Sequence, residues 1–227
     1  IQGQARNIRY EILSNYCKKN KIKTLLTAHN LEDQVETFFI RLSRGSGLKG
    51  LSAMKSLSRI DNKINLYRPL LDTKKFFLTK ISKTVFGKYF KDPANKNVKY
   101  LRTKVRNLKK PLEKSGIEYE QIIKSINNLA LSKDTLEGYF KEIFKDLIQK
   151  SGKEISLNFE KFNELNKEVK IAVINESIKK LKNNYYNPRS KKVNNLIKNI
   201  QKSNFKKSTL GGCEFFLKKD NLCLKIE

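Results

Sequence analysis

Residues 28–37 read Ala-His-Asn-Leu-Glu-Asp-Gln-Val-Glu-Thr, and Arg44-Gly45-Ser46-Gly47-Leu48-Lys49-Gly50-Leu51 follows a few residues later. This stretch contains the only histidine of the chain, His29, and two carboxylates three residues apart, Asp33 and Glu36. A short apolar segment, residues 23–28, precedes it and is typical of a buried strand. The stretch therefore predicts a strand that leads into a helix, with polar side chains at the junction where open α/β sheets bind ligands.

The helix that follows this strand has recognisable start and stop signals. Asn30 is a plausible N-cap with Asp33 at the third helical position, and the glycines after Arg44 are expected to end the helix. One face is apolar and is expected to pack inward, with Leu31, Val35, Phe38, Phe39 and Leu42 at helical spacing. Asp33 and Glu36 share the opposite face, which is either a solvated surface or part of a site. The nearby histidine favours a site, although a single histidine is more often structural.

Working outward from this stretch, helical and extended segments alternate. Residues 5–18 and 74–84 have helical periodicity, and residues 65–71 are extended, which is the rhythm of a doubly wound α/β domain with a parallel sheet. Only about two strands are visible, too few for a sheet that stands alone, so this domain is expected to be partial. We predict that residues 1–115 form the C-terminal part of an α/β domain.

The remaining residues, 116–227, predict a second, mostly helical domain. Residues 92–95 read as a turn, and a helix over residues 100–110 is expected to end before Pro111. The pattern from 118 to 200 is nearly all helical, with helices expected over residues 129–148, 169–181 and 192–200. Residues 210–226 predict a terminal β-hairpin around Lys219-Asp220-Asn221.

The charge of the chain indicates an anionic partner. The formal net charge is +27, with 49 Lys and Arg against 22 Asp and Glu, which favours RNA or DNA binding. An A/T-rich codon bias would explain the excess of Lys over Arg but not the scarcity of acidic residues. No apolar run is long enough to cross a membrane, so no membrane partner is expected. The three cysteines are far apart without a CxxC pair, which predicts reduced thiols in a cytoplasmic protein.

Three groups of residues are candidates for binding phosphate or nucleic acid. The turn Arg44-Gly45-Ser46-Gly47 offers backbone amides for an anion, with an arginine beside them. Arg102 and Arg106 lie one helical turn apart, so their planar guanidinium groups suit a phosphate chain, or they are plain surface charge. Tyr185 and Tyr186 precede Arg189, Lys191 and Lys192, a combination that either stacks bases or packs at a domain edge.

Several of these motifs together resemble the tRNA(Ile)-lysidine synthetase family, which belongs to the ATP pyrophosphatase (PP-loop) superfamily. The signature is the 28–37 stretch with Arg41-Leu42-x-Arg44-Gly45-Ser46-Gly47 and Gly50-Leu51. Further matching motifs are Ala5-Arg6 with Arg9-Tyr10, Arg68-Pro69-Leu70-Leu71, Asp92-Pro93-Ala94-Asn95, Tyr100-x-Arg102-x-x-Val105-Arg106, Pro111-Leu112 and Leu210-Gly211-Gly212. Motif density is high up to Leu112 and low afterwards.

The resemblance implies an ATP-dependent ligase. Such an enzyme joins L-lysine to the wobble cytidine, C34, of a tRNA(Ile) with a CAU anticodon, after ATP with Mg²⁺ has adenylated the cytidine. By this resemblance His29, Asp33 and Glu36 are candidate catalytic residues, with Asp33 also a metal ligand and Glu36 a contact for the lysine ammonium group. Arg6, Arg102 and Arg106, together with the 44–47 turn, are expected to bind nucleotide or phosphate, and Arg189, Lys191 and Lys192 to bind tRNA. A homodimer is compatible with the sequence.

The chain also departs from the family. Asn30, Glu32 and Thr103 stand where the family often has His, Asp and Asn. The family's Ser-Gly-Gly-x-Asp-Ser phosphate loop is absent from these 227 residues. We therefore expect a fragment of a longer enzyme, or a remnant, that is poorly active or inactive alone. The alternative function is a non-catalytic basic RNA-binding protein; a related tRNA thiolase is disfavoured by the unpaired cysteines.

Overall fold

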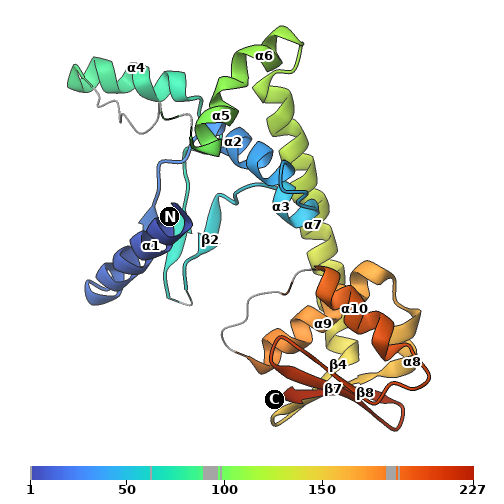
Figure 1. Ribbon diagram of the computed structural model, residues 1–227. Coiled ribbons are helices and arrows are strands. Elements are labelled where there is room, and N and C mark those ends of the chain that lie inside the picture. The colour runs from blue at the N-terminus through green and yellow to red at the C-terminus, as the bar shows by residue number, and fades with distance from the viewer. Residues whose placement is uncertain (1, 62, 89–96, 98, 183–187, 189) are drawn as a thin grey trace. The chain divides into compact units, whose positions relative to one another are not determined.

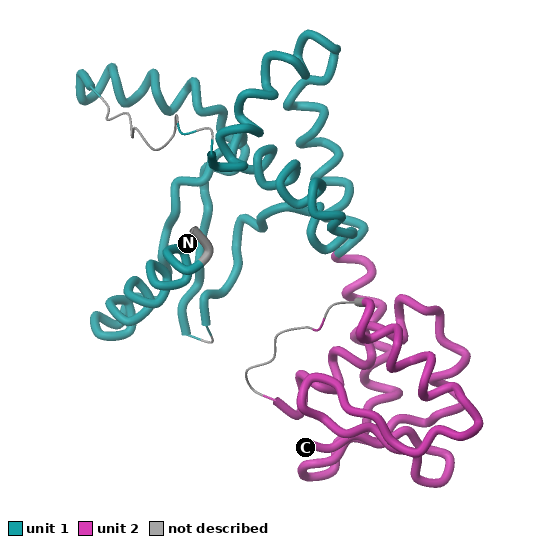
Figure 2. The backbone as a smooth tube through the Cα atoms, in the orientation of Figure 1, with its two compact units in different colours: residues 1–133 teal, residues 134–227 magenta. Residues whose placement is uncertain are grey.

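A computed structural model describes residues 2–61, 63–88, 97, 99–182, 188 and 190–227. The chain divides into two compact units, Ile1–Lys133 and Asp134–Glu227 (Figure 2). Helix α7 (Tyr119–Leu147) contributes to both units. The boundary expected near residue 115 falls in the connection that precedes α7, and it stays a prediction. Within the described residues, no helix is long and apolar enough to cross a membrane.

The first unit contains a small mixed sheet and several helices (Figure 1). Its elements before α7 are α1 (Gln2–Lys19), β1 (Thr24–Leu26), α2 (Leu31–Leu42), α3 (Leu48–Leu51), β2 (Leu57–Arg59), β3 (Asn65–Tyr67), α4 (Lys75–Phe86), α5 (Leu101–Asn107) and α6 (Lys109–Lys114). The strand order is β1-β3-β2, with β1 parallel and β2 antiparallel to β3. The parallel pair and the α/β class were predicted from the sequence, whereas β2 was missed.

The core of the first unit lies between α2 and α7. Leu31 and Val35 of α2 are buried against Tyr119, Ile122 and Ile126 of α7. The apolar stripe of α2 thus packs inward as expected, except at its last member, Leu42, which is 47% exposed.

One expectation about burial in this unit was wrong. The strand at residues 23–28 was expected to be buried, but Leu26 is 61% exposed. The predicted helix α1 forms, and Ile8, Ile12 and Tyr16, which make up an apolar stripe along it, are exposed. The physical reason is the size of the sheet, because three strands of three residues offer too little surface to cover α1 and both faces of β1.

The helix expected to end before Pro111 also differs. Helix α5 ends at Asn107, and α6 then runs through Pro111. Pro111 is the third residue of α6, where a backbone N–H has no partner inside the helix, so proline removes no hydrogen bond.

The second unit is a five-stranded antiparallel sheet packed against helices (Figure 1). The strand order is β4-β5-β8-β7-β6. Its elements after α7 are β4 (Ile148–Ser151), β5 (Glu154–Asn158), α8 (Phe159–Glu164), α9 (Lys167–Leu181), α10 (Ser190–Ile200), β6 (Lys207–Leu210), β7 (Cys213–Lys218) and β8 (Asn221–Ile226). The terminal hairpin is confirmed as β7 and β8, which turn at Lys219 and Asp220.

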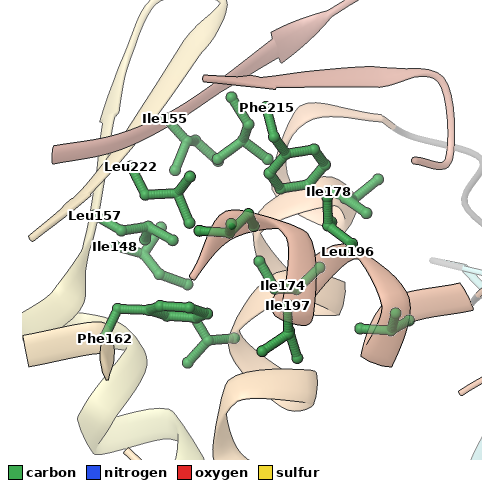
Figure 3. Close-up of a cluster of buried hydrophobic side chains, with 14 of the residues drawn as sticks. Ile148, Ile155, Leu157, Phe162, Ile174, Ile178, Leu196, Ile197, Phe215 and Leu222 are labelled. Carbon is green, nitrogen blue, oxygen red and sulfur yellow. The ribbon is translucent and has the colours of Figure 1, made fainter. Parts of the chain in front are cut away.

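Strands β4 and β5 lie in the segment that was expected to be helical. In β5 the buried residues Ile155 and Leu157 alternate with more exposed neighbours, and Gly152 takes a positive φ of 58° in the turn before it. That alternation and the glycine turn were the available signal. One face of the sheet and helices α8, α9 and α10 enclose an apolar core that includes Phe162, Ile174 and Phe215 (Figure 3).

Candidate functional site

Helix α2 is fixed at its first turn by its own side chains. Asn30 Oδ1 accepts a hydrogen bond from the Asp33 amide, and Asp33 Oδ2 accepts one from the Asn30 amide, both at 3.1 Å. This reciprocal cap confirms the N-terminus expected from the sequence. One residue further on, the side-chain amide of Gln34 both donates to and accepts from the Met54 backbone at 2.8 Å. The start of α2 is therefore held in a defined position.

Glu36, one turn further along α2, is bound by two arginines from α5. Arg102 Nε donates to Glu36 Oε2 at 2.7 Å, and Arg106 Nε donates to Glu36 Oε1 at 2.6 Å. Arg106 Nη2 also donates to Oε2 at 3.2 Å, and Arg102 Nη2 lies 3.4 Å from Asp33 Oδ1. The structure thus brings Asp33, Glu36, Arg102 and Arg106 into one cluster.

The burial of this cluster distinguishes it from a solvated helix face. The Glu36 side chain is only 4% exposed, and those of Arg102 and Arg106 are 35% and 29% exposed. Burial disfavours the charged guanidinium of Arg106, but the hydrogen bond and negative charge of Glu36 outweigh it and raise the pKa of Arg106. The two arginines are therefore positioned cations with one side still open to water.

His29 lies just before this cluster, at the carboxyl end of β1. Its Nδ1 is 3.0 Å from the hydroxyl oxygen of Thr27. Partial burial lowers the pKa of His29, and the charges of Arg68, Arg6 and Arg102 act in the same direction, against the opposing effect of Asp33. A lowered pKa keeps the imidazole neutral at physiological pH, so it can donate or accept a proton or hydrogen bond.

A cavity of about 360 Å³ opens beside the cluster. Helices α2, α4, α5, α6 and α7 all contribute to its lining, which consists of Glu32, Glu36, Lys75, Phe76, Thr79, Arg106, Lys109 and Tyr119. Burial, followed by the charge of Glu36, raises the pKa of Tyr119 to about 12. The cavity therefore presents a neutral phenol, an aromatic ring and paired charges to a ligand.

Arg6 lies outside this cavity lining, on α1. Its guanidinium is 5.2 Å from the centre of the Tyr10 ring. Burial is the main cause that lowers the pKa values of His29, Arg41 and Arg68, and the positive charge of Arg6 lowers all three further. These groups therefore share one electrostatic environment.

The turn Arg44-Gly45-Ser46-Gly47 follows α2 directly. The amides of Arg44 and Ser46 donate to the Arg41 carbonyl, and that of Gly45 donates to the Leu42 carbonyl. These three amides complete the C-terminal end of α2. The Arg44 side chain itself is exposed.

The tRNA-binding residues expected in the second unit are only partly described. Lys191 and Lys192 are exposed in the first turn of α10. Arg189, Tyr185 and Tyr186 lie outside the described residues.

Sequence reasoning missed the structural roles of two arginines in this region, Arg41 and Arg68. Arg41 donates to the carbonyls of Gly50 and Ala53, and buried Arg68 donates to the Lys55 carbonyl and the Ser58 hydroxyl. Their positions in the quoted motifs were the available signal. Tyr119 was also missed, and nothing in its sequence neighbourhood marks it.

Comparison with known proteins gives one family match and many relatives. Residues 1–112 match the PP-loop domain model. The tRNA(Ile)-lysidine synthase of Wolbachia pipientis wMel is 34% identical over 216 residues, covering 94% of this chain and 50% of that protein. That of Rickettsia typhi is 32% identical over 222 residues, covering 94% and 49%. The chain spans about half the length of the curated relatives it matches.

One solved structure is also similar. It is the U34-tRNA thiolase NcsA from Methanococcus maripaludis with its [4Fe-4S] cluster, with a TM-score of 0.46 and 22% identity, covering 57% of this chain and 43% of that one.

In the described part of this chain, Cys17, Cys213 and Cys223 are free and buried. No group of three or more His, Cys, Asp or Glu side chains in that part is placed to hold a metal ion.

Proposed function

Because the chain belongs to the tRNA(Ile)-lysidine synthase family, we propose that it is part of an enzyme that uses ATP to join L-lysine to the wobble cytidine of tRNA(Ile). The proposed reaction has two steps. ATP first adenylates the cytidine at C2 with release of pyrophosphate, and the lysine amine then displaces AMP. The observation that carries the proposal is the buried Glu36 carboxylate between Arg102 and Arg106, beside Asp33 and a cavity.

The paired arginines suit the phosphate chemistry of both steps. Each guanidinium presents a planar set of donors that fits a phosphate group, and Glu36 orients both through their Nε atoms. Their positive charge would stabilise the charge that develops on the phosphate oxygens. Arg6 and Arg44 are proposed to extend this positive field toward the nucleotide.

Glu36 is proposed to bind the ammonium group of lysine. Its two oxygens accept three hydrogen bonds from Arg102 and Arg106. A carboxylate has about four lone-pair sites, so one remains for the ammonium group. Neutral His29 or Glu36 could then take a proton from the ammonium group before the amine attacks.

Asp33 is the proposed protein ligand for Mg²⁺. Its carboxylate accepts the cap hydrogen bond on Oδ2, and Oδ1 lies 3.4 Å from Arg102 Nη2, so lone pairs remain for a cation. Magnesium bound with nucleotides commonly uses one or two carboxylates together with phosphate oxygens and water, which fits a single Asp33 contact. When bound, the ion would neutralise phosphate charge.

The test measures the two half-reactions separately in the full protein encoded by the gene that contains residues 1–227. Pyrophosphate release from ATP with tRNA(Ile) reports adenylation, and transfer of labelled lysine to the tRNA reports ligation. We expect Glu36→Ala to impair lysine use far more than ATP binding, and Glu113→Ala, at an exposed residue of α6, to change neither. Equal losses in lysine use and ATP binding would reject the role of Glu36. Absence of ATP binding in the wild-type protein would instead favour a non-catalytic RNA-binding protein.

A further inference from the structure

Helix α4 exposes an unusual number of large apolar side chains next to the cavity. The exposed fractions are 69% for Phe76, 51% for Phe77, 57% for Ile81, 64% for Val85 and 72% for Phe86. The same segment is strongly basic, because residues 73–88 contain Lys74, Lys75, Lys80, Lys83 and Lys88 and no acidic residue. Exposed aromatic rings among lysines are the combination that binds single-stranded nucleic acid without reading its sequence.

The side chains of α4 separate into two faces. At 100° per residue, Phe76 and Phe86 fall on the same side as Lys75, Lys80 and Lys83, and we call this the aromatic–lysine face. Phe77, Ile81 and Val85 fall on the other side and form a purely apolar face. The inference concerns the aromatic–lysine face alone.

The aromatic–lysine face begins at the cavity. Phe76, Lys75 and Thr79 line that cavity together with Glu36 and Arg106. The start of α4 is fixed to α2, because the Lys75 amide donates to Glu32 Oε2 at 2.8 Å and the Leu31 amide donates to the Thr73 carbonyl at 3.1 Å. The face therefore leads outward from the candidate site along α4.

We propose that the aromatic–lysine face of α4 is a platform for unpaired nucleotides of the RNA loop whose reactive base enters the cavity. The proposal rests on the function proposed above and adds the surface that holds the RNA. Bases would stack on Phe76 and Phe86 while Lys75 and Lys80 neutralise the phosphates. The two rings are ten residues apart, or about 15 Å along the helix, which is room for about four stacked nucleotides.

Charge favours RNA over a protein segment as the occupant. A protein element laid on this face would bury lysine ammonium groups, which is costly unless carboxylates pair with them. RNA offers flat bases that can stack on the aromatic rings of this face and negative phosphates that can pair with its lysines. A covering protein segment or a second copy of the chain is the competing outcome.

The experiment compares substitutions at Phe86, which is exposed at the end of α4. The probe is a hairpin RNA with an unpaired loop that carries a fluorescent base analogue, and a fully paired RNA of equal length serves as a second probe. We expect Phe86→Ala and Phe86→Leu to raise the Kd for the hairpin about 5- to 100-fold and to reduce quenching of the analogue, with little effect on the paired RNA. Phe86→Tyr, which keeps an aromatic ring, should bind nearly as the wild type does.

Two controls separate stacking from general packing. Val85→Ala alters the apolar face and should leave hairpin binding unchanged. Phe86→Leu keeps apolar volume without an aromatic ring, so wild-type binding by this variant would overturn the platform. If the wild type self-associates, and if Phe86→Ala abolishes this self-association without affecting hairpin binding, the face binds a second copy of the chain instead. If the wild type fails to bind the hairpin at all, the proposed function fails as well, whereas normal binding by all Phe86 variants rejects the platform alone.

Discussion

Glu36 joins two helices of the first unit through one buried carboxylate. Both of its oxygens accept hydrogen bonds from Arg102 and Arg106, and the side chain is 4% exposed. Removing one partner of a buried ion pair costs about 3–5 kcal/mol because the other charge stays desolvated. Here each arginine side chain retains about a third of its exposure, so the cost should be smaller.

We expect Glu36→Gln to lower the free energy of unfolding of the first unit by about 2–4 kcal/mol. Urea unfolding followed by the NMR signal of the single histidine measures this change in the first unit. Glu113→Gln is the matched control, because its contact with Lys109 is exposed and 3.9 Å long and should matter by less than about 1 kcal/mol. Equal effects of the two substitutions would contradict the importance of the buried cluster.

His29 provides a second prediction at the residue scale, because it is the only histidine in the chain. Its pKa is lowered in the folded protein by burial, so the unfolded state takes up a proton first as the pH falls. The His29 contribution to stability is therefore complete above about pH 6.5 and decreases below it. An NMR titration should give a pKa below 6.5, and His29→Asn should reduce the loss of stability between pH 7.5 and 5.5. A titration at or above the usual value would contradict this.

At the scale of elements, α2 determines where the carboxylates of the site lie. Its reciprocal cap is local, because Asn30 and Asp33 are three residues apart. We expect Asn30→Ala to cost about 1–2 kcal/mol of stability, whereas Asn30→Asp, which keeps the accepting oxygen, should cost little. Thermal unfolding of the three proteins measures the difference. If Asn30→Asp lowers the stability as much as Asn30→Ala does, loss of the cap hydrogen bond does not explain the destabilisation.

The elements that the sequence did not predict depend on partners far along the chain. Strand β2 is three residues long and exists because it pairs with β3. Strands β4 and β5 interrupt a helical pattern because β5 pairs with β8, more than sixty residues later. By contrast, the helix predicted over residues 192–200 forms as α10 (Ser190–Ile200), because its helical pattern is contained within the segment.

At the scale of the whole molecule, the two compact units have separate cores. Phe215 is fully buried in the core of the second unit, which also contains Ile174 and Ile178. We expect Phe215→Ala to destabilise that unit by about 3–5 kcal/mol. Circular dichroism should show earlier loss of structure while the NMR signal of His29 in the first unit remains unchanged. Simultaneous loss of both signals would show that the units unfold together.

The sequence by itself determined the family resemblance, the α/β class, the capped helix with Asp33 and Glu36 on one face, and the terminal hairpin. The capped helix and the hairpin depend on residues close together in the chain, so local backbone geometry fixes them, whereas the resemblance and the class follow from the order of motifs and elements along the chain. Only the tertiary structure decided that Glu36 is buried between Arg102 and Arg106, 66 and 70 residues away. It also decided that Tyr119 and Phe76 line the same cavity and that the apolar stripe of α1 stays exposed. Which groups become neighbours, and which faces remain uncovered, depends on how distant segments pack, and periodicity within one segment carries no record of that.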